Sequence, residues 1–390
     1  MIKDRLRILV LSIDLFKMVN VKFLENNCGV HGVVEEIMSH PPEGITYTHF
    51  RSNKKNDFIS VPIVEDDSAD LIEAFDTFTI TKKDWIYNGS NFSQLASFDL
   101  FGTYLSRSSR LQILEKILEK DNCKKIIFPS KAGSDTLFSY GNMKNKAILE
   151  KCAVVPYAFR KVDDSFINKE RSDKVKLLFI GSQFIRKGGR QVADAFEVLN
   201  KKYDDLELNI VSNFAVMEKF TDKEDTLAIK ARLSNMKNVN FLSRDRNDVL
   251  DHHYPDSDIF VLPTFWESFG FVFVEAMAYG LPVVSTDWPV AVPEIVEDNK
   301  SGFLIKIMGS DFMKAVENNT NKYNFGGFYM PDSKFHKYLV NELVDKLSLL
   351  IEDSSLRKKM GLAGLNIARS KFSFEKRNKI MKAIYEEAAI

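Results

Sequence analysis

The sequence predicts an α/β chain built from two doubly wound parallel sheets. Short runs rich in Val, Ile, Leu and Phe alternate with longer amphipathic stretches, a pattern typical of parallel strands joined by crossover helices. This pattern occurs twice, and a polar, charged stretch without periodicity at 160–174 separates the two occurrences as a linker. At roughly 100 to 200 residues per domain, a chain of 390 residues also indicates two domains.

Six strands are predicted in the first half of the chain. They are placed at Leu6–Leu11, Tyr47–Phe50, Phe58–Val64, Trp85–Tyr87, Lys125–Phe128 and Ala153–Pro156. Helices are expected between them, and Leu111–Lys120 has the clearest helical pattern. The apolar run near the start resembles a secretory signal, but it is short and ends at Asp14, so a first strand is the preferred interpretation.

A second set of strands is predicted after the linker. Its members are Lys176–Gly181, Leu206–Val211, Val239–Leu242, Ile259–Pro263, Leu281–Ser285 and Phe303–Ile305. Three helices close the chain, at Lys337–Glu352, Ser355–Ser370 and Phe374–Ala388. The stretch 309–333 has Asn-Asn, Gly-Gly and Pro-Asp pairs and no regular period, so we expect a long loop or flap there.

The composition excludes several classes of protein. Lys and Arg total 54 and Asp and Glu total 54, which argues against a nucleic-acid partner because that function needs a large positive field. A hydrophobic content of 45% excludes disorder as the main state. No segment reaches the ~20 apolar residues that cross a bilayer. Nothing in the sequence predicts an oligomeric state.

The cysteines indicate a reducing compartment. Cys28, Cys123 and Cys152 are odd in number, lie far apart and form no Cys-x-x-Cys pair. Neither a disulfide framework nor a zinc site is therefore supported. We expect a cytoplasmic protein.

The most informative stretch is 262–286, which reads LPTFWESFGFVFVEAMAYGLPVVST. A predicted strand leads into a loop with Glu267, and the helix that follows contains Glu275. At a rise of about 1.5 Å per residue, Glu275 lies roughly two turns into this helix, so the two carboxylates are offset along its axis. The free amides at the start of the helix lie between them and suit a diphosphate. In the simpler interpretation, Glu267 stabilises the helix dipole and Glu275 is solvated.

A second stretch, 177–189, reads LLFIGSQFIRKGG. A buried strand opens at Gly181 into a loop that ends in Arg186 and Lys187. A glycine lets the backbone approach a ligand, and the two cations can neutralise phosphate oxygens. The spacing does not fit a Walker loop, and no strand leads into G-x-G-x-x-G, which disfavours a dinucleotide dehydrogenase. The simpler interpretation is an ordinary turn with a solvated basic pair.

Taken together, these motifs resemble the retaining nucleotide-sugar glycosyltransferases of family 4, which have the GT-B fold. The shared features are the Glu-x7-Glu element with its EAMAYGLPVV tail, the Gly181 loop, Val155-Pro156-Tyr157, PEIVEDNKSGFLI at 293–305, and Phe372-Ser373-Phe374 before a last helix. The resemblance is dense over the carboxyl half and thin over the amino half. It implies two Rossmann-like domains that face each other across an interdomain cleft. We expect them to cover 1–165 and 166–373, with the helix at 374–390 packing back on the first domain.

The resemblance also implies roles for individual residues. Glu275 would bind the ribose hydroxyls, since one carboxylate can accept two hydrogen bonds from a cis-diol. Glu267 would face the transferred sugar, acting through position and charge rather than covalent attack. Arg186 and Lys187 would stabilise the departing diphosphate, on which negative charge grows in the transition state. These last three are the candidate catalytic residues.

The remaining donor-binding candidates are in loops. Backbone amides around Phe269, Gly270 and Phe271 would hold sugar hydroxyls and phosphate, and the loop at Gly181 and Ser182 would border the donor. The family usually has an arginine where this chain has Ser182, and Arg186 is expected to supply the missing charge.

In the amino half, the stretch 28–36 resembles a glycine-containing turn of the family that approaches the donor phosphates and the acceptor. Gly29, His31 and Gly32 are the candidates there. Many relatives also have a histidine after a middle strand, but no histidine follows Trp85–Tyr87 in this chain. The match in this half is accordingly loose.

The activity implied is that of a metal-independent retaining hexosyltransferase without a cofactor. Its donor would be a UDP-sugar in preference to a GDP-sugar, and its acceptor a saccharide or a lipid-linked molecule. A GT-B phosphorylase or sugar-nucleotide epimerase is the alternative enzyme. A non-catalytic nucleotide-sugar-binding paralogue, or a partner subunit of a glycosyltransferase, is the alternative from another class.

Charge is uneven within the amino half. Residues 107–161 contain 12 Lys and Arg against 5 Asp and Glu, a net charge of +7, and the stretch 57–100 before them is acidic. A basic amino domain could contact anionic lipid on the inner membrane face. The alternative, slightly preferred, is a pair of solvated faces that compensate each other.

Overall fold

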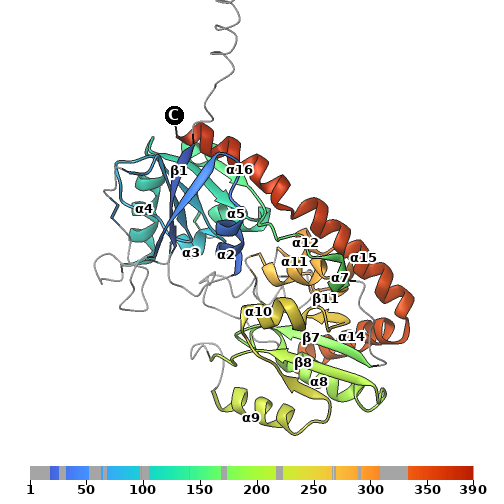
Figure 1. The fold of residues 1–390 in the computed structure, drawn as a ribbon. Helices are drawn as coiled ribbons and strands as arrows, with labels where there is room; N and C mark the ends of the chain where they lie inside the picture. Colours follow the sequence, from blue (N-terminus) through green and yellow to red (C-terminus); the bar gives the residue numbers. More distant parts are fainter. Residues whose placement is uncertain are drawn as a thin grey trace, which may run out of the picture. The chain divides into compact units, whose positions relative to one another are not determined.

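Two compact units make up the chain in a computed structural model, and each unit contains one parallel sheet with helices on it (Figure 1). The structure describes residues 18–25, 32–51, 63–64, 68–96, 98, 105–139, 141–167, 174–216, 223–265, 267, 269–288, 291–307 and 333–389. The first unit comprises 1–156 with 374–390, and the second comprises 157–373.

The first unit has a parallel sheet in which the described strands follow the order β2-β1-β3-β4-β5-β6. The strands are β1 (Val19–Glu25), β2 (Ile45–Arg51), β3 (Leu71–Phe75), β4 (Trp85–Asn88), β5 (Cys123–Phe128) and β6 (Cys152–Val154). The helices between them are α2 (Gly32–Ser39), α3 (Phe92–Leu95), α4 (Arg107–Leu118), α5 (Lys131–Ser139) and α6 (Lys146–Glu150). Since β1 lies between β2 and β3, the winding reverses at β1, which makes the sheet doubly wound.

Four of the strands predicted for this half are confirmed, as β2, β4, β5 and β6. The predicted strand Leu6–Leu11 lies outside the described residues, and so does most of Phe58–Val64, of which Ile63 forms an isolated bridge to Ile80. Strands β1 and β3 were not predicted. In β1, Asn20 and Lys22 interrupt the apolar run, and in β3 a fully buried glutamate does so.

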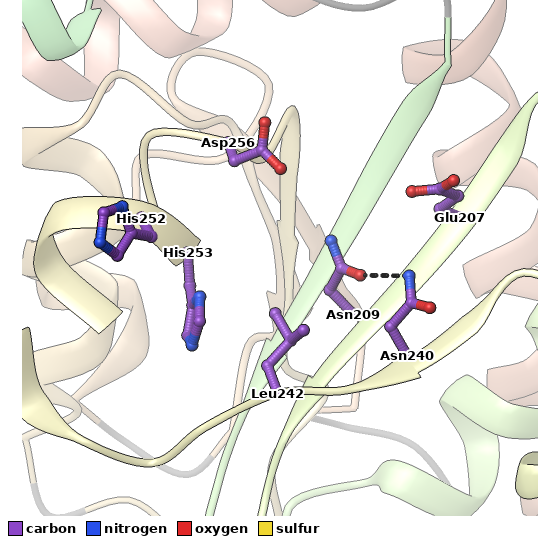
Figure 2. Close-up of a pocket in the computed structure, with 7 residues that line it drawn as sticks. All are labelled: Glu207, Asn209, Asn240, Leu242, His252, His253 and Asp256. Atoms are coloured by element: carbon purple, nitrogen blue, oxygen red, sulfur yellow. Dashed lines mark hydrogen bonds between the residues drawn. The ribbon is translucent and has the colours of Figure 1, made fainter. Parts of the chain in front are cut away.

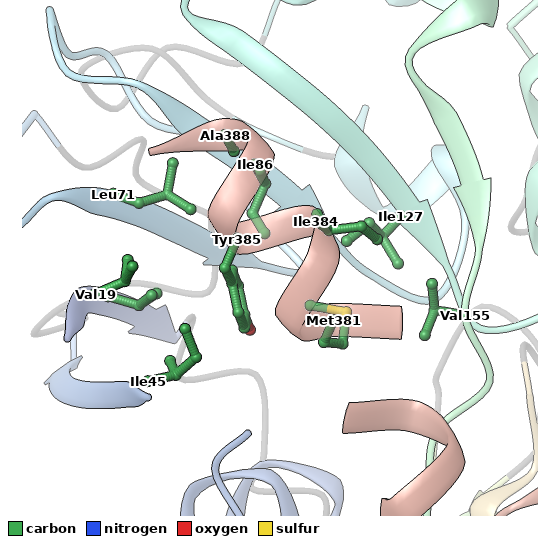
Figure 3. Close-up of a cluster of buried hydrophobic side chains, with 11 residues drawn as sticks. Val19, Ile45, Leu71, Ile86, Ile127, Val155, Met381, Ile384, Tyr385 and Ala388 are labelled. Carbon is green, nitrogen blue, oxygen red and sulfur yellow. The ribbon is translucent and has the colours of Figure 1, made fainter. Parts of the chain in front are cut away.

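The last helix, α16 (Phe374–Ala388), belongs to the first unit. Its apolar face packs against side chains from β1 to β5, so one helix covers most of the width of the sheet (Figure 3). The buried cluster comprises Val19, Val21, Ile45, Leu71, Ile86, Ile127, Val155, Met381, Ile384, Tyr385 and Ala388. At about 1.5–3 kcal/mol for each fully buried aliphatic side chain, this contact holds the helix firmly on the sheet.

A buried polar network fixes α16 at the centre of this contact. The Glu73 carboxylate accepts hydrogen bonds from the Asn88 amide, at 2.7 Å, and from the Tyr385 hydroxyl. The Tyr385 and Tyr47 hydroxyl oxygens lie 2.8 Å apart, and burial raises the pKa of Tyr47 to about 12. Burial also raises the pKa of Glu73, while the nearby Arg377 guanidinium opposes that shift. The unpredicted strand β3 is therefore stable because α16 and β4 satisfy its glutamate.

The second unit has a parallel sheet whose described strands follow the order β12-β11-β10-β7-β8-β9. They are β7 (Val175–Ile180), β8 (Leu206–Val211), β9 (Val239–Phe241), β10 (Ile259–Val261), β11 (Val283–Thr286) and β12 (Gly302–Ile305), and every strand predicted for this half is confirmed. The helices are α7 (Asp164–Ile167), α8 (Gly189–Leu199), α9 (Lys223–Ser234), α10 (Arg246–Asp248), η1 (Val249–His253), α11 (Phe271–Ala278), α12 (Val292–Ile295), α14 (Ser333–Glu352) and α15 (Ser354–Lys371).

The division between the units falls after Pro156, earlier than the predicted boundary at 165. The residue just before the predicted linker packs within the second unit: the Phe159 ring lies edge-on against Phe271 with centroids 5.8 Å apart, and the Phe159 N–H donates to the Phe372 carbonyl at 2.9 Å. The linker also contains α7. The predicted flap at 309–333 lies outside the described residues except for Ser333, where α14 begins.

Among the helices that the structure describes, none combines the length and the apolar composition that a bilayer crossing requires.

We predict that Arg377→Met weakens the first unit strongly. Arg377 is buried beside Glu73, and removing one member of a buried charge pair typically costs about 3–5 kcal/mol. Amide hydrogen exchange in β3 should therefore become roughly 10²- to 10³-fold faster. Lys379→Met, at an exposed position of the same helix, is the matched control and should leave exchange unchanged. An acceleration below about tenfold in Arg377→Met would contradict the prediction.

Candidate functional site

The two informative motifs meet at one edge of the second sheet. Strand β7 pairs with β8 on one side and with β10 on the other, so the winding of the sheet reverses between β7 and β10. Open parallel sheets bind ligands at this kind of switch point, at the carboxyl ends of the strands. The loop after β7 carries Gly181 to Lys187, and the loop after β10 carries Glu267 and Gly270. The sequence motifs thus leave from adjacent strand ends.

A close backbone approach joins the two loops. Gly188 has φ +79°, in the left-handed region, and caps the start of α8. A Cβ atom at this position would lie 2.2 Å from the Pro263 carbonyl oxygen, so only glycine fits there. Two residues earlier, the Arg186 carbonyl accepts a hydrogen bond of 3.1 Å from the Phe265 N–H. This contact brings the side chains of both loops together.

An ion pair between Lys187 and Glu267 lies where the loops meet. Both are largely covered, with 11% and 14% of their side-chain surfaces exposed. Burial lowers the pKa of the Lys187 ammonium, and the Glu267 charge opposes that shift. The simpler interpretation of a solvated basic pair is therefore wrong for Lys187.

Gly181 makes room for this lysine. A Cβ atom at Gly181 would lie 3.0 Å from Cγ and 3.1 Å from Cβ of Lys187, and the Gly181 N–H donates to the Val211 carbonyl at 3.0 Å. The glycine at the end of β7 thus lets the Lys187 side chain cross the strand end toward Glu267.

Arg186 and Ser182 differ in their surroundings. Burial lowers the pKa of the Arg186 guanidinium, and Glu267 opposes this shift, so the same carboxylate interacts with both neighbouring cations. Ser182 is exposed, and its carbonyl accepts a 3.1 Å hydrogen bond from the Ala215 N–H. The structure therefore has one largely covered carboxylate, Glu267, that interacts with two cations on a single loop.

Helix α11 begins directly after Gly270, whose φ is +85°. A Cβ atom there would lie 2.5 Å from the Phe273 ring, so the left-handed glycine sets the start of the helix. Phe269 is buried, with its ring 5.1 Å from Tyr157 in an edge-on contact. Because the Phe269 and Phe271 rings pack on the unit's own aromatic residues, a ligand could meet these residues only through their backbone.

Glu275, four residues after the start of α11 at Phe271, is a buried carboxylate. It is 1% exposed, so the simpler interpretation of a solvated position is wrong. The Tyr254 hydroxyl donates to Oε2 at 2.7 Å, and the Arg246 Nη1 lies 2.5 Å from Oε1. Burial and the neighbouring carboxylate raise the pKa of Tyr254 well above its ordinary value. The pairing of Glu275 with Tyr254 and Arg246 was not predicted, because it joins α10 and the residue after η1 to α11 and needs the tertiary structure.

Of the amino-terminal candidates, Gly29 and His31 lie outside the described residues, and Gly32 is the first residue of α2. Another histidine, which was not predicted as a candidate, lies at the carboxyl edge of the first sheet. His49 Nε2 lies 2.9 Å from Oε2 of the buried Glu25, at the carboxyl ends of β2 and β1. This pair could have been found only after β1 had been recognised as a strand.

A separate cavity of about 330 Å³ lies between β8, β9 and η1 (Figure 2). It is lined by Glu207, Asn209, Asn240, Leu242, His252, His253 and Asp256. Lys174 lies 2.6 Å from Glu207 and Lys176 lies 2.7 Å from Asp256, so both carboxylates are neutralised. None of the predicted site residues lines this cavity.

The described residues contain no group of three or more His, Cys, Asp or Glu side chains arranged to hold a metal ion.

We predict that Gly188→Ala destabilises the second unit more than Gly280→Ala. Both glycines have a positive φ, +79° and +73°, so both variants carry the left-handed penalty of about 1–2 kcal/mol. At Gly280 the nearest atom to an added Cβ lies at an ordinary 3.6 Å, whereas at Gly188 it is a carbonyl oxygen at 2.2 Å. The clash should cost a further 1–3 kcal/mol, approximately.

Hydrogen exchange in β7 and β10 measures this difference. Equal acceleration in the two variants would show that the approach of Gly188 to Pro263 does not hold the loops together.

Residues 161–317 match the family model described as glycosyl transferases group 1. An uncharacterised glycosyltransferase of Haemophilus influenzae is 27% identical over 221 residues, which is 56% of this chain and 54% of that protein. The chain thus spans about half the length of the curated relatives it matches.

Solved structures show the same fold. A glycosyltransferase from Rickettsia africae superposes with a TM-score of 0.63 at 15% identity, covering 95% of this chain and 98% of that one. A variant of Staphylococcus aureus TarM, solved with fondaparinux, α-GlcNAc-glycerol and UDP, superposes with a TM-score of 0.55 at 14% identity, covering 81% of this chain and 55% of that one. These likenesses confirm the α/β, GT-B fold class predicted from the sequence. The segment 161–317, which carries Arg186, Lys187, Glu267 and Glu275, therefore matches the glycosyl transferases group 1 family.

Proposed function

We propose that the protein is a glycosyltransferase that moves a sugar from a nucleoside diphosphate donor to an acceptor. The observation that carries this proposal is the buried Lys187–Glu267 pair at the switch point of the second sheet, beside the start of α11. A buried cation beside free helix amides suits a diphosphate, and a carboxylate beside it suits sugar hydroxyls. The match of the surrounding segment to the group 1 family supports the same activity.

The donor diphosphate would lie against Lys187, Arg186 and the backbone N–H groups at Gly270 and Phe271. Negative charge grows on the diphosphate as the glycosidic bond breaks, and fixed cations in a covered site stabilise it more than water does. Lys187 is well suited because its position is fixed by Glu267 and by the room at Gly181. Arg186 would supply the charge that the family usually has at the position of Ser182.

Glu267 would hold Lys187 in place and face the transferred sugar. In the proposed reaction the bond from the anomeric carbon to the diphosphate oxygen breaks while an acceptor oxygen bonds to that carbon from the same face. The leaving phosphate takes the acceptor's proton, so the anomeric configuration is retained and no covalent enzyme intermediate forms. The role of Glu267 is therefore electrostatic.

Glu275 would bind the ribose of the donor. Its carboxylate has about four lone-pair positions; the Tyr254 hydroxyl donates to Oε2, and the Arg246 guanidinium forms an ion pair with Oε1. The remaining capacity matches the two hydroxyls of a ribose. The N–H groups at Phe269, Gly270 and Phe271 lie between this site and Glu267 along the chain, which is the order needed for a diphosphate between ribose and sugar.

The donor, the cofactor requirement and the acceptor belong to the same proposal. The donor would be a UDP-hexose, a choice supported by UDP in the TarM structure, with a GDP-sugar as the second choice. The cations and the helix start would neutralise the diphosphate without a metal ion or other cofactor. The acceptor would be a saccharide or a lipid-linked molecule, met in the cytoplasm or at the inner membrane face through the basic stretch 107–161.

Donor hydrolysis tests the proposed function directly. Purified protein is incubated with UDP-sugars and GDP-sugars without acceptor, and released nucleoside diphosphate is measured. Release above the rate of a Lys187→Ala variant supports an enzyme. Donor binding without any turnover, with or without added saccharides, would indicate a non-catalytic binding protein instead.

We predict that Glu267→Gln lowers kcat about 10²-fold, because the neutral amide no longer holds the buried Lys187 ammonium in place. The measurement is nucleoside diphosphate release at saturating donor. Glu297→Gln is the matched control, since it breaks an exposed pair in which Lys300 lies 2.5 Å from the carboxylate. Near-normal turnover in Glu267→Gln would refute even the electrostatic role.

We also predict a pH dependence of donor binding that Lys187 sets. Burial lowers the pKa of this lysine, so the ammonium loses its proton at a lower pH than an ordinary lysine near 10.4. A neutral amine cannot neutralise the diphosphate, and UDP affinity should therefore fall as the pH rises through the lowered pKa. Calorimetric titrations from about pH 7 to about pH 10 measure this fall. Lys187→Met should lack it, and an equal alkaline loss in that variant would assign the effect to another group.

A further inference from the structure

The surroundings of Glu275 suggest a further role for Arg246 in the donor site, an inference that rests on the proposed function. Three residues form a compact group in which the Glu275 carboxylate has one partner on each oxygen: the Tyr254 hydroxyl on Oε2 at 2.7 Å and the Arg246 Nη1 on Oε1 at 2.5 Å. A buried carboxylate needs such partners, because an uncompensated buried charge is costly.

The members of this group differ in their access to solvent. Tyr254 is fully buried and Glu275 is 1% exposed, but 26% of the Arg246 side chain is exposed. Arg246 is thus the member of the group with the largest exposed fraction, although its Nε and Nη2 atoms are buried.

The backbone of Arg246 is fixed although its side chain can turn. Arg246 is the first residue of α10, and the Asp245 carboxylate caps this helix by accepting from the Asn247 N–H at 2.9 Å. An arginine side chain has several rotatable bonds, and its head is readily solvated at the surface. Rotation about the side-chain bonds can thus move the guanidinium relative to Glu275 while the backbone of α10 stays in place.

We propose that Arg246 occupies the ribose position of Glu275 in the nucleotide-free protein, and that the ribose hydroxyls displace it from Oε1. The guanidinium compensates the buried carboxylate until the nucleotide arrives. The displaced head turns into solvent, while Tyr254 keeps its hydrogen bond to Oε2 and holds the carboxylate in position. Arg246 is therefore a competitor of the ribose and Tyr254 is a positioning residue.

Competition between Arg246 and the ribose affects nucleotide binding differently from an arginine that only supports Glu275. A nucleotide with a complete ribose must break the Arg246–Glu275 pair, so part of the free energy of its hydroxyl contacts is offset. A 2′-deoxynucleotide gains less from displacing the pair and leaves it closed more often. The preference for ribose over 2′-deoxyribose is accordingly reduced in the wild type. Removing the guanidinium should increase that preference.

The test compares the dissociation constants of UDP and 2′-deoxy-UDP for the full chain, measured by calorimetry at about pH 8, with GDP and 2′-deoxy-GDP in parallel. The ratio within each pair isolates the 2′-hydroxyl, because base and diphosphate are common to both ligands. The ratio is the dissociation constant of the 2′-deoxynucleotide divided by that of the ribonucleotide. In Arg246→Met this ratio should rise about three- to tenfold over the wild type. Arg246→Gln, which is also uncharged, should raise it in the same direction.

Two controls complete the experiment. Arg244→Met removes an exposed cation from the same loop and should leave the ratio unchanged, even if it weakens both nucleotides. Glu275→Gln should bring the ratio toward one. An unchanged or smaller ratio in Arg246→Met and Arg246→Gln overturns the inference, since a fixed supporting arginine would lower the preference when removed. Failure of the wild type to bind either nucleotide would instead overturn the proposed function.

Discussion

The candidate site depends on the contact between Gly188 and the Pro263 carbonyl. Because no side chain fits between them, the loops after β7 and β10 lie as close together as two backbones can. That proximity lets the Lys187 and Glu267 side chains meet and lets Phe265 donate to the Arg186 carbonyl. The same glycine starts α8, so one residue sets a helix, a loop contact and the position of a cation.

Buried charge is handled in the same way in both units. In the first unit, Glu73 in the middle of a strand is satisfied by Asn88, Tyr385 and the nearby Arg377, and the network secures the last helix. In the second unit, Glu267 and Glu275 each have a cation as partner. The difference lies in access: the first network is enclosed by the core, whereas Arg246 reaches solvent. An enclosed polar network such as that of Glu73 stabilises the fold. A carboxylate whose partner can move, such as Glu275, can exchange that partner for a ligand.

Strands were predicted correctly where the run of apolar residues in the sequence matches the burial of those residues in the structure. Every strand of the second sheet has an apolar run bounded by turn residues, so all were placed correctly. In the first sheet, β3 was missed because Glu73 breaks the apolar run, and this glutamate is satisfied by Asn88 of the next strand and by Tyr385, 312 positions away in the chain. The glutamates of the Glu-x7-Glu element were identified as candidates, but their burial and their cationic partners could not be read from spacing.

What the sequence alone determined is the fold class, the second sheet and the identity of the residues that meet at its edge. Those features depend on short-range periodicity, on glycine at positions that need it, and on motif spacing within one strand–loop–helix unit. Only the tertiary structure decided which charges are paired. The Glu275 carboxylate is compensated by Arg246 in α10 and by Tyr254 directly after η1, and neither has a spacing relation to α11. Ion pairs between separate elements are set by how the chain packs, because burial makes an unpaired charge too costly to persist.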